Sequence, residues 1–302
     1  MHDIKYLVLI YLVLAMITSP VLATTEQIDR EIQYSPYPKY FAPTQNKCEP
    51  ILLNSLTSDY KDKINIVVIG YGFSSDFIAK YEASQKFSIS MGLFFRTQPL
   101  SSRRYDFNIW YHNMIGINPD NWDAPSKYIS AAKECPANIV IVLSAADIRS
   151  LTSVGYTTYV AAYNDNNIVL HELGGHAVGG LIDEYGYTGQ QIKPINCDDN
   201  PTCLKFQSIP GYNSSGCTLG CSGIYNYRSK LSTTMKNPAD TDFGIVNRYI
   251  INKRIDYMLQ ANIKPIVPPN SPNTLQLFQN AVASLLNNLK EWICINTGQW
   301  CI

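Results

Sequence analysis

The 302-residue sequence predicts an α/β fold with a mainly parallel, twisted sheet. Two short apolar runs, at residues 63–70 and 138–143, have the uniform hydrophobicity of strands that are buried on both faces. Segments with helical signals alternate with strand-like segments as far as residue 180. From residue 186 to 234 the chain is rich in Gly, Asn, Ser and Cys, which predicts a disulfide-rich, irregular C-terminal half.

The individual elements follow from local patterns. Serines after the first apolar run are typical helix caps and predict a helix that begins near Asp76. The aromatic and β-branched segment 156–163 is typical of an edge strand, which we place over the cleft. The strands are expected at residues 63–70, 105–111, 138–143 and 156–163. The helices are expected at residues 76–95, 126–132 and 166–180.

Composition excludes several classes of protein. Lys plus Arg and Asp plus Glu both number 24, so the net charge is zero. A nucleic-acid-binding protein needs a basic face that displaces counterions, and we therefore expect no nucleic-acid partner. Hydrophobic residues make up 46% of the chain, which is enough to form a core and argues against extensive disorder.

The N-terminus is typical of a secretory signal peptide at residues 1–23. Lys5 precedes an apolar run, Pro20 breaks the run, and Ala23 provides a small residue where a signal peptidase would cleave. The same run is long enough to act instead as an uncleaved anchor. We expect cleavage, and therefore a secreted, extracellular protein that has no membrane association afterwards.

The remaining chain divides into four expected segments. Residues 24–47 are polar and contain several prolines, so they form either an extended arm or a short pro-segment. Residues 48–262 hold the expected strands and form the main domain. Residues 263–272 are a stiff Pro-rich linker, and residues 273–302 form an amphipathic helix with a Cys-containing tail.

Cysteine usage fits the secretory interpretation. The chain has 8 cysteines, and an even number after a signal peptide predicts disulfides. Close spacing favours local bridges, and the alternative is a structural zinc site made by the four cysteines between residues 197 and 221. The favoured pairs are Cys197–Cys203, Cys217–Cys221 and Cys294–Cys301, which leaves Cys48–Cys135 as a long-range bridge.

Two histidines and a glutamate form the most informative pattern. Neutral imidazole is a good zinc ligand, and Glu172 beside His171 has the position of a base that accepts a proton from water. His176 is five residues after His171, so a regular α-helix would separate the two rings by about 140°. A π-bulge would bring the rings together, and Gly174 and Gly175 permit such a bulge. Without the bulge, Glu172 and His176 would share one helix face.

The motif and several other segments resemble the IgA-peptidase family of secreted, metzincin-like zinc peptidases. The histidine motif here contains one extra residue relative to the family pattern. The resemblance covers roughly residues 60–255, and it implies a metzincin-like fold for the main domain. The matching segments are Gly179–Tyr185, Lys63–Phe73, Tyr105–Trp110, Tyr227–Arg228, Thr233–Met235 and Phe243–Arg248.

The resemblance also implies a set of metal ligands. His171 and His176 would bind Zn²⁺, and Asp183 is the preferred third ligand. The position at which a metzincin carries its third ligand holds an isoleucine in this chain, so Glu184 and His112 remain alternatives to Asp183.

The implied function is that of a secreted zinc-dependent endopeptidase acting on protein or peptide substrates. Glu172 would be the general base, and Met235 would form the apolar floor beneath the metal. The alternative is a catalytically inactive homologue that serves as an extracellular binding module, because the extra glycine is a departure from the family's zinc motif.

Overall fold

The computed structural model describes residues 27–263, apart from residues 34–37, 44–45, 57–58, 114–124, 148, 154–157, 186–193, 214, 216 and 223–225. The chain divides into two units after Lys264, and the described residues all belong to the first unit. The expected signal peptide, nearly all of the linker, and the expected C-terminal helix and tail lie outside the described residues. Among the helices that are described, none is both long and apolar enough to cross a lipid bilayer.

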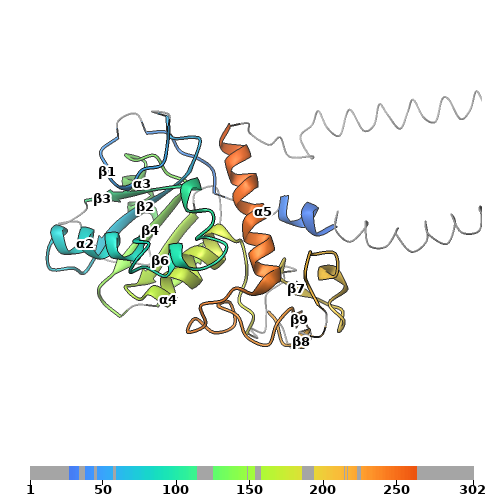
Figure 1. Cartoon of the computed structure of the whole chain (residues 1–302). Coiled ribbons are helices and arrows are strands. Elements are labelled where there is room, and N and C mark those ends of the chain that lie inside the picture. The colour runs from blue at the N-terminus through green and yellow to red at the C-terminus, as the bar shows by residue number, and fades with distance from the viewer. Residues whose placement is uncertain are drawn as a thin grey trace, which may run out of the picture. The chain divides into compact units, whose positions relative to one another are not determined.

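A six-stranded mixed sheet forms the centre of the domain (Figure 1). Its spatial order is β1-β3-β2-β4-β6-β5. The four inner strands run parallel, whereas β1 and β5 at the two ends are antiparallel to their neighbours. The prediction of an α/β fold is confirmed at this level. The strands are β1 (Glu49–Leu52), β2 (Ile64–Tyr71), β3 (Phe107–His112), β4 (Ile139–Ser144), β5 (Leu151–Ser153) and β6 (Thr158–Tyr163).

Both faces of the sheet are buried, because side chains alternate along each strand. Ile66 and Val68 of β2 belong to the core on one face, and Val67 and Ile69 belong to the core on the other. Helices α2, α5 and the π-helix η3 contribute to the first core, and α3 covers the second. The helices are α2 (Asp76–Lys86), α3 (Pro125–Ala132), α4 (Asn166–Val169), η3 (Leu170–Val178) and α5 (Gly244–Ile263), with 3₁₀ turns at η1 (Phe94–Arg96), η2 (Arg104–Asp106) and η4 (Leu204–Phe206).

Two expected elements need correction. The segment 156–163 was expected at the sheet edge, but β6 lies between β4 and β5, and the three-residue β5 is the end strand. The helix expected at 76–95 ends at Lys86. At Gly92 the chain passes so close to the carbonyl of Lys86 that a Cβ would lie 1.9 Å from its oxygen, so the chain has already turned back there. β1 and α5 were not predicted.

The irregular part of the domain is organised by nested disulfides. β7 (Cys197–Asp198) and β8 (Thr218–Leu219) flank β9 (Tyr227–Arg228) in a small antiparallel sheet. The bridges are Cys197–Cys221 and Cys203–Cys217, so the predicted pairs Cys197–Cys203 and Cys217–Cys221 were wrong. The sheet brings the two ends of the segment together, so the outer pair closes around the inner pair. The alternative zinc site is excluded too, because all four sulfurs are bonded in pairs.

The other bridges have different outcomes. Cys48–Cys135 is present and confirms the predicted long-range bridge. It joins the residue before β1 to the turn between α3 and β4. The predicted Cys294–Cys301 pair lies outside the described residues.

The segment before the sheet is not simply extended. Residues 27–33 form a short helix, where an extended arm or pro-segment was expected. Ile28 and Ile32 of this helix are fully buried in the larger core. Asp29 accepts hydrogen bonds from α5, and Glu31 forms a 2.5 Å ion pair with the buried Lys205. The helix is therefore an integral part of the domain.

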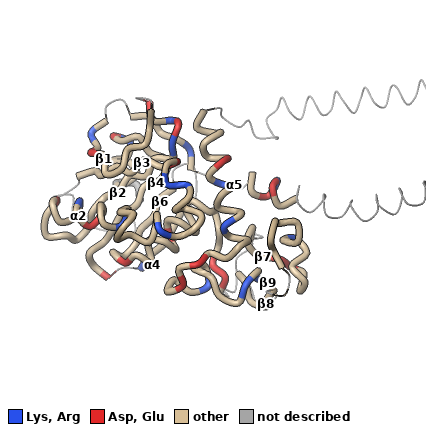
Figure 2. Tube along the Cα trace, viewed as in Figure 1, with Lys and Arg blue, Asp and Glu red and all other residues tan. Residues whose placement is uncertain are grey.

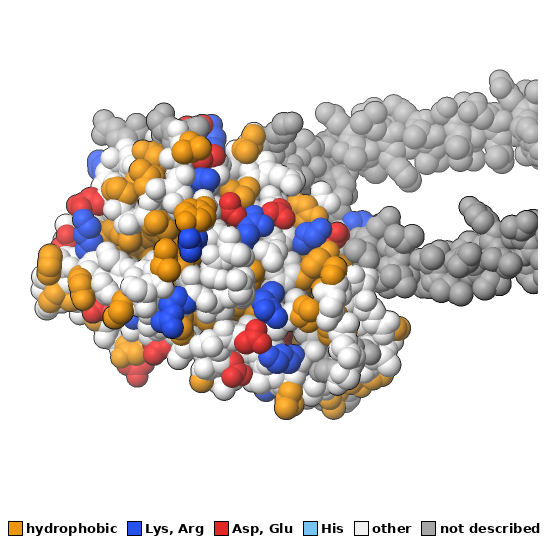
Figure 3. Space-filling view, viewed as in Figure 1, with side chains coloured by type: hydrophobic (Ala, Val, Ile, Leu, Met, Phe, Trp, Pro, Cys, Tyr) orange, Lys and Arg blue, Asp and Glu red, His pale blue; other side chains and the backbone are white. Residues whose placement is uncertain are grey.

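Charged residues of both signs are mixed in the described part of the domain as it is viewed in Figures 2 and 3. Figure 2 shows Lys and Arg interspersed with Asp and Glu along the chain trace. On the face drawn in Figure 3, basic and acidic side chains lie among apolar and neutral ones, and no broad basic area is present on that face.

Candidate metal centre

The two histidines of the motif converge because the helix between them is a π-helix. Asp165 caps the N-terminus of α4, which continues directly into η3. In a π-helix residues five apart are neighbours, so His171 and His176 face one another. Their Nε2 atoms are 3.2 Å apart, and the rings meet edge to face. The predicted local widening is confirmed, and it extends over the nine residues of η3 rather than a single bulge.

A tight turn after η3 brings Asp183 back to the two imidazoles. Gly180 adopts a positive φ of 59°, and its backbone lies so close to the guanidinium of Arg254 that a Cβ would be 2.9 Å from it. The turn places Asp183 Oδ1 3.1 Å from His171 Nε2 and 3.2 Å from His176 Nε2. Three side chains predicted as ligands from the sequence therefore lie together.

Two ring nitrogens and one carboxylate oxygen place three lone pairs close together. His171 Nδ1 is 2.8 Å from the carbonyl oxygen of Thr234, and His176 Nδ1 is 2.7 Å from that of Leu181. A carbonyl oxygen can only accept, so both Nδ1 atoms must donate, and in neutral imidazoles both Nε2 atoms carry lone pairs. Asp183 Oδ1 is buried, and its contacts with the rings lack hydrogen-bond geometry. Three acceptors this close together would be stabilised by a proton or a metal cation between them.

The electrostatics of the centre favour positive charge. Burial raises the pKa of Asp183, but the contacts with His171 and His176 outweigh burial and bring that pKa well below its ordinary value. Burial lowers the pKa of His176, but Asp183 and the nearby charge of Glu172 outweigh it, so the pKa of His176 is raised. A proton on His176 would meet this demand in part, and a divalent cation would meet it fully.

The three donor atoms fit a zinc ion in kind and in spacing. Zinc prefers imidazole nitrogen and carboxylate oxygen, and ligand bonds of about 2.0–2.1 Å in a tetrahedron place donor atoms about 3.3 Å apart. The separations here are 3.1, 3.2 and 3.2 Å. Three protein ligands would leave the fourth position of a tetrahedral ion open.

Glu172 lies beside the candidate ligands and is held by one hydroxyl. Its side chain is buried, with 7% exposed. Thr152 Oγ1 of β5 donates to Glu172 Oε2 at 2.7 Å and also lies 3.1 Å from the Glu172 carbonyl oxygen. The predicted general base is thus located on the same helix as the histidines and in contact with the end strand of the sheet.

Met235 lies against η3, as predicted for the floor of the centre. It is fully buried, and a Cβ added at Gly175 would be only 2.2 Å from its Sδ atom. Glycine at position 175 therefore allows the methionine to contact the helix backbone between the two histidines.

Glu184, one of the alternative ligands, has a different role. Its carboxylate accepts hydrogen bonds from Thr233 Oγ1 at 2.6 Å and from Asn247 Nδ2 at 2.8 Å, and its N–H donates to the carbonyl oxygen of Met235. Burial raises the pKa of Glu184 despite these bonds. The side chain thus ties the Asp183 turn to the Met235 turn and to α5.

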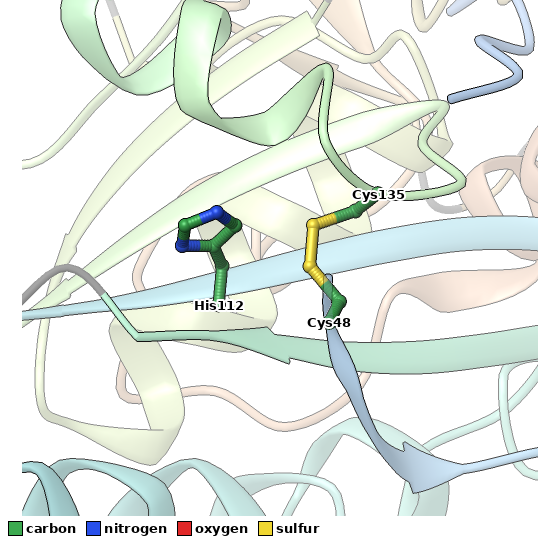
Figure 4. A group of neighbouring side chains, drawn as sticks. All are labelled: Cys48, His112 and Cys135. Carbon is green, nitrogen blue, oxygen red and sulfur yellow. A yellow bond between two sulfur atoms is a disulfide. The ribbon is translucent and has the colours of Figure 1, made fainter. Parts of the chain in front are cut away.

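His112, the other alternative ligand, belongs to a separate group with Cys48 and Cys135 (Figure 4). The two sulfurs are joined in a disulfide. His112 Nδ1 is 3.0 Å from the carbonyl oxygen of Asn113, and Nε2 is 3.1 Å from a carboxylate oxygen of Glu134. The sulfurs are used in the disulfide and both ring nitrogens already contact oxygen atoms, so this group is a poorer candidate for a metal than the histidine pair.

Sequence reasoning missed the groups that orient the ligands. The carbonyl oxygens of Thr234 and Leu181 hold the rings, and backbone carbonyls leave no mark in an amino-acid sequence. Thr152 was missed for a related reason, because its contact with Glu172 depends on β5, which is too short to be recognised.

The chain has no counterpart among the known proteins with which it was compared. No family model matches this chain, and no curated protein matches it. The resemblance to the IgA-peptidase family therefore stays a prediction, and the centre is assigned from its own geometry.

Proposed function

We propose that this chain is a secreted zinc-dependent endopeptidase with a metzincin-like catalytic domain. The observation that carries the proposal is the meeting of three lone-pair donors, from His171, His176 and Asp183, beside a buried glutamate. Two imidazoles, one carboxylate and an open fourth position are typical of zinc hydrolases.

Each side chain of the centre has a distinct task in peptide-bond hydrolysis. The two histidines and Asp183 would hold Zn²⁺, which polarises a carbonyl group and makes a bound water more acidic. Glu172 would accept a proton from the attacking water and donate it to the nitrogen of the leaving amine. The Nδ1 hydrogen bonds of the histidines fix their tautomers and ring orientations, as second-shell carbonyls do in metal sites.

The end strand β5 offers a place for an extended substrate. An end strand has unpaired backbone groups on one side, and extended peptides commonly add to such an edge. Thr152 of β5 contacts Glu172, so a peptide aligned along β5 would pass close to the base. This arrangement supports protein or peptide chains as the substrate class.

Secretion is supported by the cysteines together with the predicted signal peptide. Three disulfides among the described residues are typical of an oxidising compartment. The zero net charge and the mixed charges on the face drawn in Figure 3 give no support to a nucleic-acid partner.

The inactive binding module remains the competing function. The reason for considering it was the extra glycine, which would separate the histidines on a regular helix. The π-helix weakens this argument for an inactive protein, because in a π-helix the five-residue spacing brings His171 and His176 together.

Metal analysis of the purified, secreted full chain tests the proposal. We expect one chelator-sensitive Zn²⁺ per chain and cleavage of casein or gelatin that is lost on chelation and restored by zinc. Glu172→Gln should retain zinc but lose turnover by at least about a hundredfold, whereas Asp183→Ala should lose zinc. Absence of zinc in the wild type would refute the metal centre, and wild-type turnover by Glu172→Gln would refute the role of the glutamate.

A further inference from the structure

We propose that Thr152 is a positioning residue for Glu172, an inference that rests on the proposed peptidase function. Thr152 Oγ1 is 2.7 Å from Glu172 Oε2, and this is the single hydrogen bond to that carboxylate found within the described part of the chain. Glu172 is otherwise enclosed, with 7% of the residue exposed. Its orientation therefore depends on one hydroxyl.

The geometry makes this hydroxyl a stiff support. Thr152 is paired with Val160 in the β5–β6 ladder, so its backbone is fixed in the sheet. A β-branched side chain on a strand has few χ1 rotamers, so the hydroxyl stays where the strand places it. A hydroxyl has one proton, and its 2.7 Å contact with the carboxylate is shorter than its 3.1 Å contact with the Glu172 carbonyl oxygen.

This support divides the two carboxylate oxygens of Glu172 into different roles. Oε2 accepts the hydrogen bond from Thr152. This leaves Oε1 as the oxygen that would take a proton from water. A base that is fixed in this way does not have to be oriented anew in each turnover, and misplacement of a catalytic group by 1 Å can cost about a hundredfold in rate.

The location of Thr152 also links the base to the substrate strand. β5 is both the strand that holds Glu172 and the end strand along which a peptide would pair. A peptide paired with β5 would therefore lie along the same strand that orients the base. The inference thus deepens the proposed function by giving one strand two tasks, to dock the substrate and to orient the general base.

Three variants test the role of Thr152. Thr152→Val keeps shape and strand preference but removes the donor, and Thr152→Ser keeps the donor. Thr158→Val is the matched control, because Thr158 is a fully buried threonine of the neighbouring β6 whose hydroxyl has no hydrogen-bond partner within the described residues. We expect Thr152→Val to lower kcat about 10- to 100-fold with KM within about twofold, Thr152→Ser to stay within about threefold, and Thr158→Val to match the wild type.

A second measurement does not need turnover. Acetohydroxamate is titrated against each zinc-loaded variant. This small metal chelator has an acidic proton that it shares with an adjacent base. Thr152→Val and Glu172→Gln should both weaken its binding by about tenfold or more, whereas Thr152→Ser and Thr158→Val should not. Zinc content should equal that of the wild type in all these variants.

The outcomes separate the two proposals. Wild-type zinc and hydroxamate binding without casein or gelatin cleavage would refute the peptidase function, while the hydroxamate series would still decide the role of Thr152. Wild-type kcat and hydroxamate affinity in Thr152→Val would overturn the positioning role alone. A wild-type chain that binds no zinc would overturn both.

Discussion

The contact between Gly175 and Met235 predicts a large effect from a single methyl group. In Gly175→Ala the new Cβ would lie 2.2 Å from Met235 Sδ and 3.0 Å from its Cε atom. Favourable contacts between such atoms are about 3.5–4.0 Å long. The contact with Sδ would therefore be more than about 1 Å too short. Met235 is fully buried, so it can move only by displacing its neighbours.

The expected cost follows from this overlap. Overpacking a closed core costs about 1–3 kcal/mol, partly offset by roughly 1 kcal/mol because alanine is a better helix former than glycine. Met235 is next to Thr234, whose carbonyl oxygen holds His171, so displacement of the methionine should also disturb a metal ligand. We expect lower thermal stability and a zinc affinity reduced about 10- to 100-fold.

The assay compares Gly175→Ala with a neighbouring glycine. A Cβ at Gly174 would meet its nearest side-chain atoms at 3.0 and 3.3 Å, a much smaller overlap, so Gly174→Ala should be destabilised less than Gly175→Ala. Thermal unfolding and zinc competition against a chromophoric chelator are measured for both glycine variants, for Met235→Ala, and for Gly175→Ala combined with Met235→Ala. The double variant should show favourable coupling of at least about 1 kcal/mol, because truncation removes the clash. Equal stability and zinc affinity in both single variants would contradict the account of Met235 as a fixed floor.

Two further predictions concern the periphery of the centre. Replacing Cys203 and Cys217 by serine removes a bridge with a sequence separation of 14, and should lower the free energy of unfolding in urea by about 3 kcal/mol. Peptide mapping of the wild type that finds either cysteine bonded elsewhere would show the nested pairing to be wrong. Burial raises the pKa of Asp242, but Lys230 and the N–H of Gly244 outweigh it and lower that pKa. Its contribution should therefore be fully present at neutral pH and decline as pH falls below about 4, so Asp242→Asn should be destabilised by less than about 1 kcal/mol at pH 7. In urea unfolding this difference should shrink as the pH is lowered below about 4. A difference that persists unchanged at pH 3 would argue against the charge as its source.

The central strands and the metal ligands could be predicted because their signals are local. β2 and β4 are buried on both faces, so their side chains form continuous apolar runs that stand out in the sequence. The glycines between His171 and His176 likewise pointed to a widened helix, since no regular α-helix satisfies a five-residue spacing.

Other features could not be predicted because they depend on tertiary pairing. β5 has three residues, and it is a strand only because β6 lies beside it. The nested disulfides depend on β9 pairing with β7 and β8, whereas spacing along the chain favoured the local pairs.

The helix α5 is a different case, because a usable signal was present. Val246, Ile250, Ile251, Ile255 and Met258 are all buried and recur at helical spacing. The signal is weakened by Arg254, which is also buried on that stripe and interrupts the apolar pattern.

The short helix at residues 27–33 contributes to the stability of the domain. Loss of this helix would expose the core side of two isoleucines, Ile28 and Ile32, each contributing about 1.5–3 kcal/mol when buried. It would also leave Lys205 enclosed without the carboxylate of Glu31. Removal of this stretch should therefore destabilise the domain.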